Sequence, residues 1–151
     1  MTRYELLLFV HVLAAAAWFG AALLAIVLIE LATRAEDTPL VVRLGEYDEK
    51  LAPLLFIPAG IATLLTGVAL VFDGPWSFTG DGWVLAGLVL FAAIFALGVG
   101  LILPAGKKLA ALARADAPAA ELQRQIGNLR MLSWIGVGLL AAAIFFITTK
   151  P

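Results

Sequence analysis

Four stretches without any Asp, Glu, Lys or Arg divide this chain, and each is long enough to cross a lipid bilayer as a helix. They cover residues 6–29, 51–72, 82–106 and 131–149, and a helix needs roughly 20 apolar residues to cross the hydrocarbon core. Strands of a membrane barrel would alternate apolar and polar residues over about 10 positions, and no segment here does so. The sequence therefore predicts an all-α bundle of four transmembrane helices, spanning about 5–32, 51–72, 82–106 and 131–149, as one domain over residues 1–151.

Composition supports the same solvent and excludes several functions. The chain is 63% hydrophobic and 14% charged, with a mean hydropathy of +1.03, which is more apolar surface than a soluble domain of this size buries. The absence of cysteine excludes disulfides and thiolate metal sites within the chain. The ten basic residues are dispersed among eleven acidic ones, so no basic face for nucleic acid is expected, and the predicted partner is the lipid bilayer.

The first apolar stretch competes with a signal peptide, because Arg3 precedes it and Ala35 ends a small-residue site. A signal core has about 7 to 15 apolar residues, and the stretch over 6–29 is much longer. We therefore expect it to be a membrane span of the mature protein.

The lysines and arginines alternate between the two sides of the predicted bundle. Eight of the ten lie in the connections between spans one and two and between spans three and four, and the other two are Arg3 and Lys150. Positive charge near span ends stays in the cytoplasm. The sequence predicts a multi-pass protein of the inner membrane with both termini outside the cytoplasm and with helical extensions on the cytoplasmic side.

Small residues at fourfold spacing predict the helix contacts, because close packing of small side chains drives helix association in lipid. The expected seams are Ala17-Ala21-Ala25, Ala59-Thr63-Gly67, Ala92-Ala96-Gly100 and Gly138-Ala142, with Gly20 as a further packing position. Pro58 and Pro104 should kink or end their helices. A shift of 80 residues also places Gly20 on Gly100 and Arg34 on Arg114, which indicates either a duplication or chance.

His11 is the only side chain within a span that titrates near neutral pH. It shares a helix face with Ala14, Ala15 and Trp18, so it should look into the bundle. One interpretation is that it binds a haem iron, a metal or a moving proton, since polar groups at this depth often serve a site. The other is a hydrogen bond to a neighbouring helix, at Thr63 or Thr66. Without a second histidine or a cysteine, no copper or zinc shell can be assembled from one chain.

No spacing matches a nucleophile with its base, a phosphate loop or a zinc motif, so no catalytic or metal-ligating residue is predicted. The carboxylates between spans one and two are expected to pair along their helices, Glu30 with Arg34 and Glu46 with Lys50.

Several short motifs resemble a known family. They are the segment Phe9 to Gly20, Pro58 with Thr66-Gly67, the segment Trp83 to Leu88, Pro104, and Lys150-Pro151. Together they resemble a bacterial family of predicted integral membrane proteins, domain of unknown function 2269, which implies a four-helix membrane protein. The His11 to Gly20 segment is also similar to copper-resistance D-type proteins and to haem-binding membrane oxidases of protoporphyrinogen metabolism, where an intramembrane histidine ligates haem. That similarity implies the role for His11 alone.

These observations favour a non-catalytic membrane module that acts through partner proteins or as a homo-oligomer, without a cofactor. Two alternatives remain open: a redox protein that binds haem b through His11, and a small-solute or ion transporter with the proline-kinked second span lining its path. Trp18, Gly20, Pro58, Thr63, Thr66, Gly67, Gly100 and Pro104 are the candidate packing or cavity residues.

Overall fold

The computed structural model describes residues 2–150 and consists of helices joined by short turns; residues 1 and 151 of the expected domain lie outside the described range. The elements are α1 (Arg3–Arg34), α2 (Thr38–Leu51), the π-helical turn η1 (Ala52–Phe56), α3 (Ile57–Asp73), α4 (Gly82–Leu97), the π-helical turn η2 (Gly98–Ile102), α5 (Leu103–Arg114) and α6 (Ala119–Thr149). No interruption separates α2 from α3 or α4 from α5 except the π turns. The prediction of four helices able to span a membrane is confirmed.

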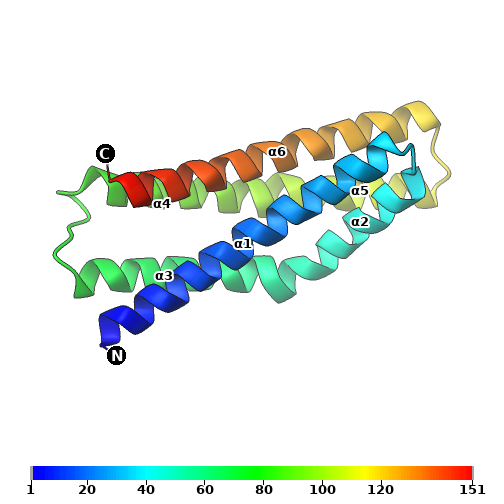
Figure 1. Ribbon diagram of the computed structural model, residues 1–151. Coiled ribbons are helices and arrows are strands. Elements are labelled where there is room, and N and C mark those ends of the chain that lie inside the picture. The colour runs from blue at the N-terminus through cyan, green and yellow to red at the C-terminus, as the bar shows by residue number, and fades with distance from the viewer. Residues whose placement is uncertain (1, 151) are drawn as a thin grey trace.

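The helices form an elongated bundle with two chemically different ends (Figure 1). Both chain ends and the turn 74–81 lie at one end, which we call the terminal end. The turns 35–37 and 115–118 lie at the other, the basic end, which carries the eight basic residues between Arg34 and Arg130. α1 packs mainly on α3, α4 on α6, and α2 on α5.

The four continuous helices have 31 to 36 residues, or about 46–54 Å at 1.5 Å per residue. The hydrocarbon core is about 30 Å thick, so the helices extend beyond it. The charged residues of α2, α5 and the first turns of α6 place this excess length at the basic end. The predicted helical extensions are therefore present.

Both π-helical turns directly precede a proline. The Ile57 N–H bonds to the Ala52 carbonyl, and the Leu103 N–H bonds to the Gly98 carbonyl; each bond spans five residues instead of four. Pro58 and Pro104, the next residues, have no N–H and would crowd the carbonyl four positions back in a regular helix. A wider turn relieves that contact while the helix continues. Figure 1 shows the bend between α2 and α3.

The bundle is filled most densely toward the basic end. The largest fully buried side chains are Ile26, Ile29, Val41, Leu109, Ile126 and Leu129, which come from α1, α2, α5 and the first half of α6. A second cluster around Trp18 and Ile94 lies further toward the terminal end. The terminal half therefore has more free space between its helices.

Three of the expected packing glycines do not face the bundle, which corrects the predicted seams. Gly20, Gly100 and Gly138 are exposed, and a Cβ added at any of them would meet nothing within 4 Å. The seam Ala59-Thr63-Gly67 does lie inward, with Ala59 8% exposed and Gly67 against His11. Fourfold spacing selects one helix face but does not say which face is inside, because small residues are equally compatible with lipid.

The two turns at the basic end have the same backbone hydrogen bonds at a distance of 80 residues. In the first, the N–H of Glu36 bonds to Thr33 O and that of Asp37 to Ala32 O; in the second, Asp116 bonds to Ala113 O and Ala117 to Leu112 O. This is the Schellman arrangement, which needs a left-handed residue after the helix. Glu36 (φ 56°) and Asp116 (φ 49°) fill that position.

The start of α2 differs slightly from the expected cap at Thr38. Asp37 is the N-cap, and its Oδ1 accepts the Leu40 N–H at 3.0 Å. α6 begins after Pro118 without a side-chain cap. The turn geometry is thus shared between the halves, and the capping chemistry is not.

Replacing Glu36 by glycine should stabilise the protein by about 0.5–1 kcal/mol. A residue with a Cβ is strained in the left-handed region, and glycine is not. Thermal unfolding in mild detergent measures the change. Ala35→Gly is the control, because Ala35 has φ −82° and gains nothing from glycine. Equal destabilisation by both variants would contradict the left-handed turn.

Candidate functional site

His11 of α1 contacts α3 through its Nδ1 atom. Nδ1 lies 3.0 Å from the backbone oxygen of Thr63 and 3.1 Å from Oγ1 of Thr66. A carbonyl oxygen can only accept, so Nδ1 carries the hydrogen. The hydroxyl of Thr66 in turn donates to Ala62 O at 2.6 Å, which leaves its oxygen free to accept from His11.

This arrangement fixes the tautomer of the neutral imidazole. With the hydrogen on Nδ1, Nε2 keeps a lone pair, and Nε2 has no hydrogen-bond partner among residues 2–150. A histidine that donates one ring N–H to a backbone carbonyl and presents the other nitrogen is the usual arrangement of a ligating histidine. The same nitrogen can accept a hydrogen bond from a ligand hydroxyl.

Beside this imidazole lies a cavity of about 440 Å³, the His11 cavity. Its volume falls within the range of small-molecule sites, about 300–1,000 Å³. α1 and α3 form one wall, and α4 and α6 form the other. Apart from His11, the wall is mostly apolar and aromatic, and it includes Tyr4, Leu8, Ala15, Trp18, Val68, Phe91, Ala143 and Ile147.

At the terminal end, two indoles and an ammonium group lie across this cavity. Nζ of Lys150 is 3.9 Å from the centroid of the Trp76 ring and 5.1 Å from that of Trp83. The two indoles meet edge to face with centroids 5.1 Å apart. All three residues line the His11 cavity, so cation–π attraction holds the C-terminal residue of the described chain over its terminal-end wall.

A layer of three buried side chains bounds the other side of the His11 cavity. Trp18, Ile94 and Leu140 are 8%, 5% and 7% exposed. They line the His11 cavity and also a second, smaller cavity of about 120 Å³ on their other side. Trp18 meets Phe91 edge to face at 5.7 Å. The indole of Trp18 is therefore a shared wall between two cavities.

The second cavity, which we call the Asp48 cavity, carries a carboxylate on its wall. Asp48 belongs to α2, before the charge-free stretch 51–72, and lines the cavity beside Glu49 and Ser133. Residues of both π turns, among them Phe56 and Gly98, line it too. Burial raises the pKa of the Asp48 carboxyl to about 6, because removal from water disfavours the charged form.

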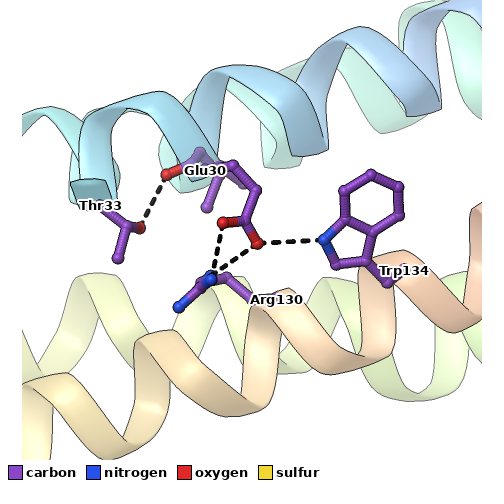
Figure 2. Close-up of polar contacts among 5 residues, drawn as sticks. Glu30, Thr33, Arg130 and Trp134 are labelled. Carbon is purple, nitrogen blue, oxygen red and sulfur yellow. Dashed lines mark hydrogen bonds and ion pairs between the residues drawn. The ribbon is translucent and has the colours of Figure 1, made fainter. Parts of the chain in front are cut away.

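Glu30 lies at the basic end of α1 and is held by α6 (Figure 2). Its carboxylate accepts from Nε and Nη2 of Arg130, at 2.9 and 2.6 Å, and from the indole N–H of Trp134 at 3.0 Å. The forked contact with a guanidinium is the strongest form of ion pair. It ties α1 to α6 where both leave the apolar region.

Two further ion pairs join α2 to α5. Oε1 of Glu46 is 2.8 Å from Nη2 of Arg114, and Oε1 of Glu49 is 3.6 Å from Nζ of Lys107. The expected pairs within one helix, Glu30 with Arg34 and Glu46 with Lys50, are not formed in the described structure. Partners on a facing helix replace them, because the antiparallel helices bring opposite charges to the same height.

The structure gathers part of the predicted site residues and disperses the rest. Thr63, Thr66 and Gly67 surround His11, and Trp18 shares its cavity. Gly20 and Gly100 face outward. Pro58 and Pro104 follow the π turns and line neither cavity.

Sequence reasoning missed Asp48, Lys150 and the pairing of Glu30 with Arg130. Only the last had a signal in the sequence: both residues border an apolar stretch at the end predicted to face the cytoplasm, which puts opposite charges at the same depth.

The fold and these cavities define a four-helix integral membrane protein with internal, mostly apolar cavities. The chain belongs to the family described as predicted integral membrane protein (DUF2269), which it matches over residues 5–151, and this confirms the resemblance seen in the sequence. Comparisons with curated proteins and with solved structures give no match.

Replacing Gly67 by leucine should destabilise the protein, whereas Gly100→Leu should have little effect. A Cβ on Gly67 would lie 3.0 Å from Cε1 of His11, so the imidazole must move and lose its hydrogen bonds, at a cost of about 1–3 kcal/mol. Thermal unfolding in the same detergent compares the variants. Equal losses would show that both glycines are in helix contacts.

Proposed function

We propose that this protein is a non-catalytic module of the bacterial inner membrane that binds a small apolar molecule carrying a hydroxyl group in the His11 cavity. The observation that carries this proposal is the state of His11. Its Nδ1–H is used by Thr63 O, so Nε2 is the one acceptor that a cavity-lining side chain of α1 keeps free. An apolar wall with one directed polar atom is the usual composition of a small-molecule site.

The proposal needs a donor on the ligand. A hydroxyl group gives its hydrogen to Nε2, and the apolar remainder occupies the wall of aromatic and aliphatic side chains. A ligand without a donor would leave Nε2 unpaired and desolvated, which costs about 1–3 kcal/mol. This difference gives the cavity its selectivity. Loading and unloading of such a ligand requires no chemical step, which fits a module that acts together with partner proteins or with copies of itself.

The donor requirement is tested with 1-naphthol and its methyl ether, 1-methoxynaphthalene, which differ in the hydroxyl hydrogen. Protein in one mild detergent is titrated with each, and the rise in melting temperature gives the apparent affinity. Naphthol should bind roughly fivefold more tightly, as for about 1 kcal/mol from one hydrogen bond. In His11→Ala the ratio should fall to about one, and this variant should lose only about 1 kcal/mol of stability.

Two matched variants of α6 test the place of binding. Ala143 lines the cavity, so Ala143→Leu should weaken both probes. Ala141 is exposed on the same helix, so Ala141→Leu should leave both affinities unchanged. Absence of binding to the wild-type protein, or an unchanged ratio in His11→Ala, would refute the proposal.

Haem b is the second candidate, since the lone pair on Nε2 could equally bind iron. The residues fit one axial ligand only: the chain has one histidine, and no group of three His, Cys, Asp or Glu side chains occurs within residues 2–150. When bound, haem would supply electron-transfer chemistry. Protein expressed with ample iron should be colourless; a stoichiometric near-ultraviolet haem band that vanishes in His11→Ala would put haem first.

Transport of a small solute or ion is supported by the two cavities that meet at Trp18, one on each side. A path between them requires the layer of Trp18, Ile94 and Leu140 to part. Since this layer is nearly fully buried, binding without passage is the function that the arrangement favours.

The termini lie outside the cytoplasm in this proposal, supported by the eight basic residues at the opposite end. The chain has no cysteine, so single cysteines report position cleanly. An impermeant thiol reagent applied to intact cells should label Ser77→Cys, in the turn 74–81, and not Ala117→Cys at the basic end. The reverse pattern would invert the topology.

A further inference from the structure

The basic end of the bundle pairs its carboxylates with one exception. Glu30, Glu46 and Glu49 each contact an arginine or lysine of a facing helix. Asp48 lies between the last two on α2, and it has no ion pair or hydrogen bond among the residues that the structure describes. Its carboxylate is the one acidic group of this region that is partly buried and uncompensated.

The surroundings of Asp48 are those of a cation site. No lysine or arginine lines the Asp48 cavity. Its wall has three aromatic side chains, Trp18, Phe56 and Phe95, and the hydroxyl of Ser133. Aromatic faces attract cations, and the attraction is stronger when the site is shielded from water. A carboxylate and several rings around one space are complementary to a positive charge with apolar substituents.

We infer that the Asp48 cavity is a binding site for a small organic cation of the alkylammonium class. The inference does not depend on the proposed function of the His11 cavity. Asp48 supplies the counter-charge, and the aromatic wall accommodates the alkyl groups.

The size of the cavity limits the cation. A volume of about 120 Å³ corresponds to roughly four water molecules at about 30 Å³ each. This admits an ion of about five non-hydrogen atoms, such as tetramethylammonium. The larger flat cations that suit many aromatic sites would not fit without movement of Trp18 or Phe95.

A metal ion suits the site less well than an organic cation. Hard cations need six or more oxygen ligands, and the cavity wall offers the side-chain oxygens of Asp48, Glu49 and Ser133. Glu49 is already paired with Lys107. Alkylammonium ions need no such shell, because their substituents are apolar.

The path to the cavity is short on the side of α2 and α5. Glu49 lines the cavity, and its side chain is 41% exposed, while its partner Lys107 is 56% exposed. This long ion pair, at 3.6 Å, lies where a cation would enter from water at the basic end. The negative side chains of Glu49 and Asp48 favour its approach.

Isothermal titration with tetramethylammonium chloride tests the inference, in detergent and with sodium chloride replaced at constant total chloride. The wild-type protein should show saturable binding. Asp48→Asn should weaken it at least tenfold through loss of the counter-charge, and Phe56→Leu several-fold through loss of one ring. Glu46→Gln, which removes a carboxylate of the same helix outside the cavity, should change it less than twofold.

The neutral molecule tert-butanol, of similar size, separates a cation site from a merely apolar one. It should neither bind measurably nor compete with tetramethylammonium. Absence of saturable binding, equal affinity in Asp48→Asn, or equally tight binding of tert-butanol would each overturn the inference. Melting curves of the variants without ligand establish that they are folded.

Discussion

Every backbone hydrogen bond within lipid has to be made inside the chain, and this constraint shapes the whole bundle. It explains why the chain forms four nearly uninterrupted helices and why all its irregular turns lie at the two ends. It also explains Pro58 and Pro104. A proline that ended its helix at this depth would expose several backbone groups, so the chain widens by one π turn and continues. The interruptions that remain are those the bilayer tolerates.

The same constraint decides what could be predicted of the fold. Four charge-free stretches predict four helices because hydropathy is a property of each segment alone. The orientation of each helix about its axis is not, since lipid and the interior are both apolar. Gly67 and Gly100 have the same surroundings in sequence, yet one touches His11 and the other faces outward. A seam becomes visible in sequence only where a polar group accompanies it, as Thr63 and Thr66 do on α3.

The candidate sites follow this distinction. His11 and its threonine partners were predictable because polar side chains are rare in an apolar span and must find each other. Asp48 was not, because it lies among five other charged residues of α2 and differs from them only in lacking a partner. Pairing across helices depends on helix heights, as Glu30 with Arg130 shows, and spacing along one helix cannot report it. Lys150 reaches Trp76 and Trp83 for the same reason.

The repeat of 80 residues bears on how the two cavities arose. The identical hydrogen bonds after Glu36 and Asp116 support a duplication, which relates α1 to α4 and α5, and α2 and α3 to α6. Under that shift, however, Pro58 falls on Gly138 and Pro104 on Leu24, so each helix with a π turn corresponds to one without. The interruptions were therefore not inherited from a common half. They lie on the two helices whose extensions, α2 and α5, pack together, and both line the Asp48 cavity. A symmetric bundle would have two equivalent cavities, and the placement of these prolines is what makes them chemically different.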